Sequence, residues 1–166
     1  MTIISSLGRH PPNRIAVRIG ALDIGYGRLV ADVMAAAASL AAKGVTAGTK
    51  AGIRAGTVSN GHSYANWVAH LAAIHLGAAH VSIVESSSAT AALQAGMIDL
   101  VIGARESLDG LPSSLKRIEF DCDPAIPLAA TDAAPPPGDE ASAARINLTS
   151  GTTGTPKFLV WDSKMI

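Results

Sequence analysis

Apolar positions recur along this chain in two rhythms, one typical of strands and one typical of helices. Residues 14–19 (RIAVRI) alternate between polar and β-branched residues, and residues 20–27 predict a turn followed by a second short strand. From Arg28 to Lys43 the apolar residues fall at steps of three and four, which indicates a helix, and Gly44 is placed to end it.

The alternation of strand and helix continues further along the chain. Short apolar runs predict strands at 50–55, 80–85 and 98–103, and helices are predicted at 59–78 and 88–96. In 59–78, Ser59 or Asn60 is placed to cap the start of the helix and Gly77 to end it, and Gly96 is placed to end the next helix. The helix in 59–78 has one apolar face, which predicts a core stripe of Tyr64, Trp67, Val68, Leu71 and Ile74. Strands and helices that alternate through short connections predict an α/β fold, with a layered, largely parallel sheet and crossover helices.

The pattern changes near residue 121, and this divides the chain into three parts. Residues 1–120 form the predicted α/β subdomain. Residues 121–143 are rich in proline, alanine and aspartate without periodicity, which indicates a linker or long surface loop. Residues 144–166 hold two β-like runs, 145–148 (RINL) and 158–162 (FLVWD), on either side of a loop of small hydroxylated residues.

Composition excludes several classes of protein. The 166 residues carry no formal net charge, so nothing indicates a nucleic-acid partner, and the single cysteine, Cys122, excludes an internal disulfide framework. The sequence shows no long apolar leader at its start and no apolar run long enough to span a membrane. A soluble cytoplasmic protein is therefore expected.

The loop from Thr149 to Lys157 (TSGTTGTPK) admits three interpretations. A plain hairpin turn explains neither the density of hydroxyl groups nor the Pro-Lys ending. A Walker-type phosphate loop needs Gly-Lys followed by Ser or Thr and then a helix, whereas here Lys157 follows Pro156 and precedes a β-like run. The third interpretation is a phosphate clamp between two antiparallel strands, in which glycine N–H groups, hydroxyls and one lysine face an anion.

The same loop resembles the signature of the adenylate-forming superfamily, which includes acyl- and aryl-CoA synthetases, adenylation domains of peptide synthetases, and luciferases. The family pattern Thr-Ser-Gly-Thr-Thr-Gly-x-Pro-Lys is matched at every fixed position from Thr149 to Lys157. The resemblance implies that ATP phosphates are bound by Thr149, Ser150, Gly151, Thr152, Thr153, Gly154, Thr155 and Lys157.

The resemblance extends upstream with less specificity, through the segments 11–17, 24–29, 40–53 and 66–83. The chain also departs from the family pattern. Thr49 stands where aspartate is usual, and residues 82–88 (SIVESSS) replace a proline-rich stretch. Phe158 and Ser163 replace the glycine and histidine found in many members.

The resemblance implies an N-terminal piece of a longer enzyme that joins a carboxylate to ATP, giving an acyl-adenylate and pyrophosphate, and then usually transfers the acyl group to a thiol. ATP and Mg²⁺ are the implied cofactors, with coenzyme A as an implied co-substrate. A carboxylic acid, ATP and the rest of the enzyme are the implied partners. No catalytic residue and no metal ligand is expected in this piece, because the resemblance places the acidic residue that handles magnesium, the ribose anchor and the C-terminal lysine in later segments. The piece alone is expected to be inactive.

Other chemistry-bearing residues favour structural roles. His62, His70, His75 and His80 lack the spacing of a helical zinc site, so they are expected to lie at the surface or to have their hydrogen bonds satisfied. Cys122 sits between two aspartates, which raise the pKa of a thiol. Glu85 follows a strand where sites of α/β proteins gather, and a role there has weak support.

Three hypotheses of function remain open: a catalytic piece of an adenylate-forming ligase, a nucleotide-binding module without turnover, and a scaffold that binds no nucleotide.

Overall fold

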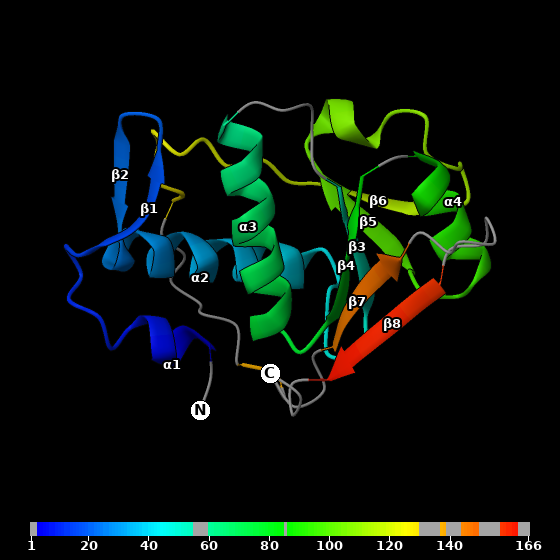
Figure 1. The fold of residues 1–166 in the computed structure, drawn as a ribbon, viewed down its shortest axis with the longest axis horizontal. Coiled ribbons are helices and arrows are strands. Elements are labelled where there is room, and N and C mark those ends of the chain that lie inside the picture. Colours follow the sequence, from blue (N-terminus) through cyan, green and yellow to red (C-terminus); the bar gives the residue numbers. More distant parts are fainter. Residues whose placement is uncertain are drawn as a thin grey trace.

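A sheet with helices on both of its faces forms the larger part of the protein, and a two-stranded hairpin lies beside it, as the computed structural model shows (Figure 1). The structure describes residues 3–54, 60–84, 86–129, 137–138, 144–149 and 157–162. The described elements are α1 (Ile3–Leu7), β1 (Ile15–Ile19), β2 (Leu22–Gly25), α2 (Tyr26–Ala42), β3 (Lys50–Arg54), α3 (Asn60–His75), β4 (Ala79–Ile83), α4 (Ser86–Gln94), β5 (Leu100–Gly103), the 3₁₀ turn η1 (Arg105–Leu108), β6 (Lys116–Glu119), β7 (Ala144–Thr149) and β8 (Lys157–Asp162).

The large sheet has six strands in the order β6-β5-β3-β4-β7-β8. The first four neighbouring pairs are parallel, and only β7 and β8 run antiparallel. The predicted α/β class with a largely parallel sheet is therefore confirmed. Strands β1 and β2 form a separate antiparallel hairpin.

Side chains of alternate residues point to opposite faces of the sheet, and each face has its own core. Ala51, Ile53 and Ile102 face a core built with α2 and α3, whereas Val81 and Val101 face a core built with α4. Gly52 lies on the α4 face, where a Cβ atom would stand 3.0 Å from both Ile83 Cγ1 and Val101 Cγ2. Glycine at this strand position thus lets two large side chains meet over the sheet.

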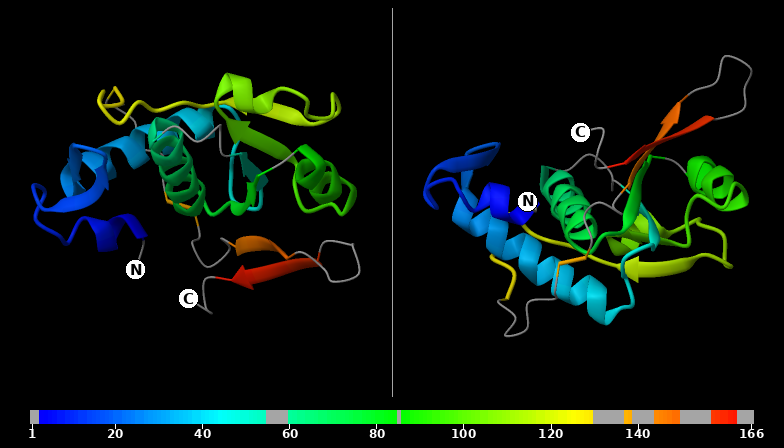
Figure 2. Two further views of the ribbon diagram at one scale, coloured as in Figure 1. Left: turned by 45° about the horizontal axis from the view of Figure 1, so that its top comes forward. Right: turned by 90° about the horizontal axis from the view of Figure 1, so that it is seen from below.

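Two crossovers put the helices on opposite faces. The chain passes from β3 to its neighbour β4 through α3, and then back across β3 to β5 through α4. Because parallel crossovers are right-handed, opposite directions of travel place the two helices on opposite sides of the sheet. Figure 1 shows α3 on the side of the β1–β2 hairpin and α4 on the other side, and the two views of Figure 2 agree.

Glycines end α2, α3 and α4 in the same way. Gly44, Gly77 and Gly96 have φ of 88°, 71° and 66°. In each case the N–H of the next residue reaches back to a carbonyl of the last turn, as from Val45 to Leu40 at 3.0 Å, and the glycine N–H bonds the following carbonyl. These are Schellman motifs, and they confirm the three predicted helix ends.

The predicted core stripe of α3 is right for most of its positions and wrong for one. Tyr64, Val68 and Leu71 are buried, and Ile74 is half-buried, but Trp67 is 38% exposed. The apolar face of α3 is instead completed by alanines, Ala65, Ala69, Ala72 and Ala73. Small side chains let α3 lie close to the sheet and to α2, and Trp67 falls outside that contact.

The prediction of strands and helices from the sequence missed α1, η1 and β6. The first two are of four or five residues and carry too little periodicity to be recognised. Strand β6 (KRIE) has one buried side chain, Ile118, between charged residues, so it lacks the short apolar run that marks β3, β4 and β5.

One buried carboxylate joins α2, α3 and the segment that follows β6. Asp32 is fully buried, and its Oδ2 accepts hydrogen bonds from Arg28 Nε at 2.6 Å and from Tyr64 Oη at 2.8 Å. Its Oδ1 accepts the backbone N–H of Leu128 at 3.0 Å. A carboxylate with these three donors from three parts of the chain is stable in the interior only while all of them are in place.

We expect Asp32→Ala to lower the free energy of unfolding by about 3–5 kcal/mol, because it leaves a guanidinium, a phenol and an N–H without their acceptor. Urea denaturation followed by circular dichroism measures the change. Asp23→Ala is the control: Asp23 is exposed and pairs only with the exposed Arg18, so its loss should leave the midpoint almost unchanged. Equal midpoints for the two variants would contradict the role given to Asp32.

Candidate functional site

The loop predicted to bind phosphate connects the two strands at one margin of the sheet. Thr149, the last residue of β7, stands directly opposite Lys157, the first residue of β8. The pairing confirms that the loop lies between antiparallel strands, and it excludes a Walker-type arrangement because a strand, not a helix, begins at Lys157. Ser150, Gly151, Thr152, Thr153, Gly154 and Thr155 lie outside the described residues.

Parallel pairing fixes which edge of the sheet carries this loop. Strand β7 runs parallel to β4, with His80 opposite Arg145 and Val81 opposite Ile146. The carboxyl end of β7 therefore lies at the same edge as the carboxyl ends of β3, β4 and β5. In open α/β sheets this is the edge where ligands bind.

The crossovers also place a switch point at this edge. From β3 the chain leaves towards α3 on one face, and from the adjacent β4 it leaves towards α4 on the other. In open α/β sheets ligands bind at such a switch point, and β7 is the next strand along from β4. Glu85, considered from the sequence for a role here, lies outside the described residues.

Two helices begin at the same edge, α3 at Asn60 and α4 at Ser86. Neither has an acidic residue in its first turn. Glu85 directly precedes α4, whereas no acidic residue stands in residues 55–63 around the start of α3. The partial positive charge of the α3 N-terminus therefore favours anions near this edge. Thr149 and Lys157, at the base of the loop, are the two predicted site residues that the structure places there.

The histidines considered in the sequence analysis do not lie at the base of the loop. His70 on α3 and His80 on β4 stack edge to face with ring centroids 5.0 Å apart, and Ser82 Oγ lies 3.2 Å from His70 Nε2. His75 is buried, and the side chain of His62 lies outside what the structure describes. The hydrogen bond between Ser82 and His70 agrees with the structural role predicted for that residue.

Burial and a neighbouring cation keep two of these rings neutral. Burial lowers the pKa of His70 to about 3, with smaller contributions from His80 and Arg145. Burial likewise lowers the pKa of His80 to about 4, with Arg145 acting in the same direction. Bases this weak are poor proton acceptors at neutral pH, so the cluster does not support acid–base chemistry.

Cys122 is buried beside the carboxylate network of Asp32. Burial raises the pKa of its thiol to about 12, and Asp32, Asp121 and Asp123 act in the same direction while Arg28 opposes them. The sequence predicted this direction from the flanking aspartates alone. The larger cause is desolvation, which no local sequence pattern reveals, and the thiol is not a nucleophile.

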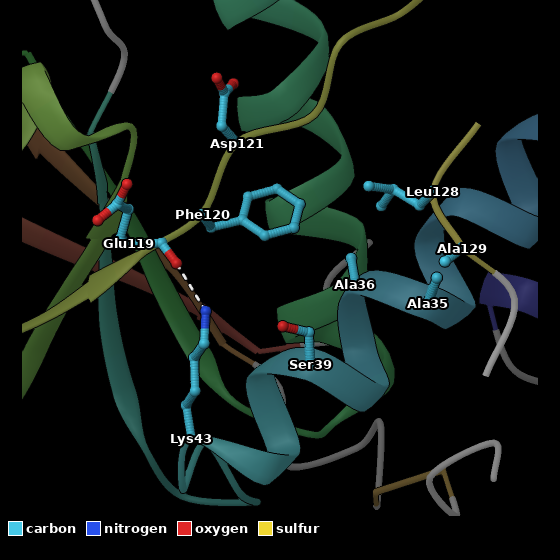
Figure 3. Close-up of a pocket in the computed structure, with 9 residues that line it drawn as sticks. All are labelled: Ala35, Ala36, Ser39, Lys43, Glu119, Phe120, Asp121, Leu128 and Ala129. Atoms are coloured by element: carbon cyan, nitrogen blue, oxygen red, sulfur yellow. Dashed lines mark hydrogen bonds between the residues drawn. The ribbon is translucent and has the colours of Figure 1, made fainter. Parts of the chain in front are cut away.

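A shallow cleft of about 250 Å³ lies on α2, far from the loop. Figure 3 shows Lys43 reaching across it, where its Nζ donates a hydrogen bond to the Glu119 carbonyl at 2.7 Å. The cleft borders the end of β6, and β6 and β8 are the two opposite margins of the sheet. It therefore lies at the opposite margin of the sheet from Thr149 and Lys157.

Two searches of the described residues gave negative results. They contain no group of three His, Cys, Asp or Glu side chains that could hold a metal ion. Within the same ranges, no helix combines the length and the apolar character needed to cross a bilayer.

Comparison with models of protein families finds no match for this chain, and comparison with curated proteins finds none either. Solved structures do match. The N-terminal subdomain of Klebsiella oxytoca NpsA in complex with 3-hydroxybenzoyl-AMSN has a TM-score of 0.73 at 20% identity, over 96% of this chain and 39% of that one. Escherichia coli MenE (R195K) with bound OSB-AMS has a TM-score of 0.67 at 19% identity, over 92% and 32%.

A third similar structure is the o-succinylbenzoate CoA synthetase of Bacillus subtilis, bound with its product analogue OSB-NCoA. Its TM-score is 0.68 at 20% identity, over 96% of this chain and 33% of that one. The chain thus has the fold that the resemblance to adenylate-forming enzymes implied, that of their N-terminal subdomain. It spans between about a third and two fifths of these chains.

We expect acid to destabilise the protein through His70 and His80. In the folded chain the pKa of His70 is about 3 and that of His80 about 4, both below the ordinary value of 6.5. Between these values and pH 6.5 the two histidines therefore bind protons in the unfolded chain but not in the folded one. Stability should be complete above pH 6.5 and fall as the pH drops towards 4, by up to about 1.4 kcal/mol per pH unit for each histidine.

Urea denaturation at several pH values tests this expectation. The double variant His70→Gln/His80→Gln should flatten the dependence between pH 6.5 and 4. An unchanged slope would show that other groups cause the acid sensitivity.

Proposed function

We propose that this chain is the N-terminal part of an ATP-dependent carboxylate-activating ligase of the adenylate-forming type. The observation that carries the proposal is the loop sequence Thr149 to Lys157, held between antiparallel strands at the carboxyl edge of the sheet. The fold of the similar structures supports the same assignment, at an identity too low to carry it alone.

The proposed role of the loop is to hold the β- and γ-phosphates of ATP. Glycines at 151 and 154 let backbone N–H groups approach the phosphate oxygens, the hydroxyls of Ser150, Thr152, Thr153 and Thr155 add donors, and Lys157 adds a positive charge. The α3 N-terminus at the same edge favours the same charge.

The proposed reaction is attack of a carboxylate oxygen on the α-phosphorus, with cleavage of the bond to the β-phosphate oxygen. An acyl-adenylate forms and pyrophosphate leaves with the electron pair of the broken bond. The donors of the loop stabilise the negative charge that grows on pyrophosphate, and holding the triphosphate extended keeps the bond in line for displacement. A magnesium ion carried in with ATP would neutralise further phosphate charge. The described residues contain no group of three His, Cys, Asp or Glu side chains that could hold it.

Transfer of the acyl group to coenzyme A is the proposed second step. One of the similar structures is a CoA synthetase. The acid-binding and thiol-binding groups of the whole enzyme are assigned to polypeptide that the similar structures have and this chain does not, since the chain spans 32% to 39% of the first two of them.

A nucleotide-binding module without turnover is the second candidate, because the loop sequence supplies donors for phosphate and no group for the chemical step. A few charge-assisted hydrogen bonds of about 1.5–3 kcal/mol each must offset about 4–15 kcal/mol of lost translational and rotational freedom. We therefore expect ATP to bind with a dissociation constant of about 1 mM or weaker.

We expect ATP and pyrophosphate, but not adenosine, to shift the amide resonances of Thr149 to Lys157 in NMR titrations. Lys157→Ala should weaken the binding of both by about 10- to 100-fold, the loss of one charge-assisted contact. Lys50→Ala is the matched control, because Lys50 begins β3 at the opposite edge of the sheet. Equal effects of the two variants would refute the phosphate role of the loop.

We expect the 166-residue chain alone to show no carboxylate-dependent exchange of labelled pyrophosphate into ATP. The chemistry requires a ribose anchor and a distant lysine that the resemblance places in later segments. Exchange with any carboxylic acid would mean that the chain is a complete minimal enzyme. Phosphate binding without exchange is the result that agrees with the proposal.

A further inference from the structure

We draw no further inference here: the strongest candidate, the cluster of His70, His80 and Arg145 where α3, β4 and β7 meet, rests on lowered pKa values alone, because Asp139 and Glu140, the acidic residues that precede β7, lie outside the described residues.

Discussion

The parallel pairing of β7 with β4 determines where the candidate site lies. After β6, at one margin of the sheet, the chain returns to the sheet at β7, which pairs with β4 through His80 with Arg145 and Val81 with Ile146. Because that pairing is parallel, the loop after β7 opens at the edge where β3 and β4 end. An antiparallel β7 would have placed the same loop at the opposite edge, away from the switch point between β3 and β4 and from the N-termini of α3 and α4.

A second constraint holds the layers beneath that edge. Asp32 accepts hydrogen bonds from α2, from α3 and from the segment after β6. One carboxylate therefore links α3, which begins at the carboxyl edge of the sheet, to α2. Tyr64 donates from the second turn of α3, near the end that faces the site. The burial that makes this network costly to break also keeps Cys122 protonated and unreactive.

The parts of the fold that could be predicted from the sequence are those encoded locally. Strands β3, β4 and β5 are short apolar runs. Gly44, Gly77 and Gly96 mark helix ends because only a residue without a side chain adopts their φ at little cost. Trp67 was misplaced because periodicity assigns a face to a helix but does not show how far the neighbouring layer extends over it. Strand β6 and the hydrogen bonds of Asp32 were not predicted from the sequence, because they depend on contacts between residues distant in sequence. Of the site, the two flanking strands were predictable from residue types and order, and the phosphate donors of the loop stay a prediction. The position of the loop at the same edge as the ends of β3 and β4 required the strand order.

The strand order also has a consequence for synthesis of the chain. The edge of β4 that receives β7 is complete once Ile83 has left the ribosome, yet β7 begins at Ala144. At the usual rate of translation, the intervening residues take roughly 3–12 s to appear. Local contacts among β3, α3 and β4 form far faster than this, so the nascent chain holds an open, apolar strand edge for seconds before its own β7 arrives to close it.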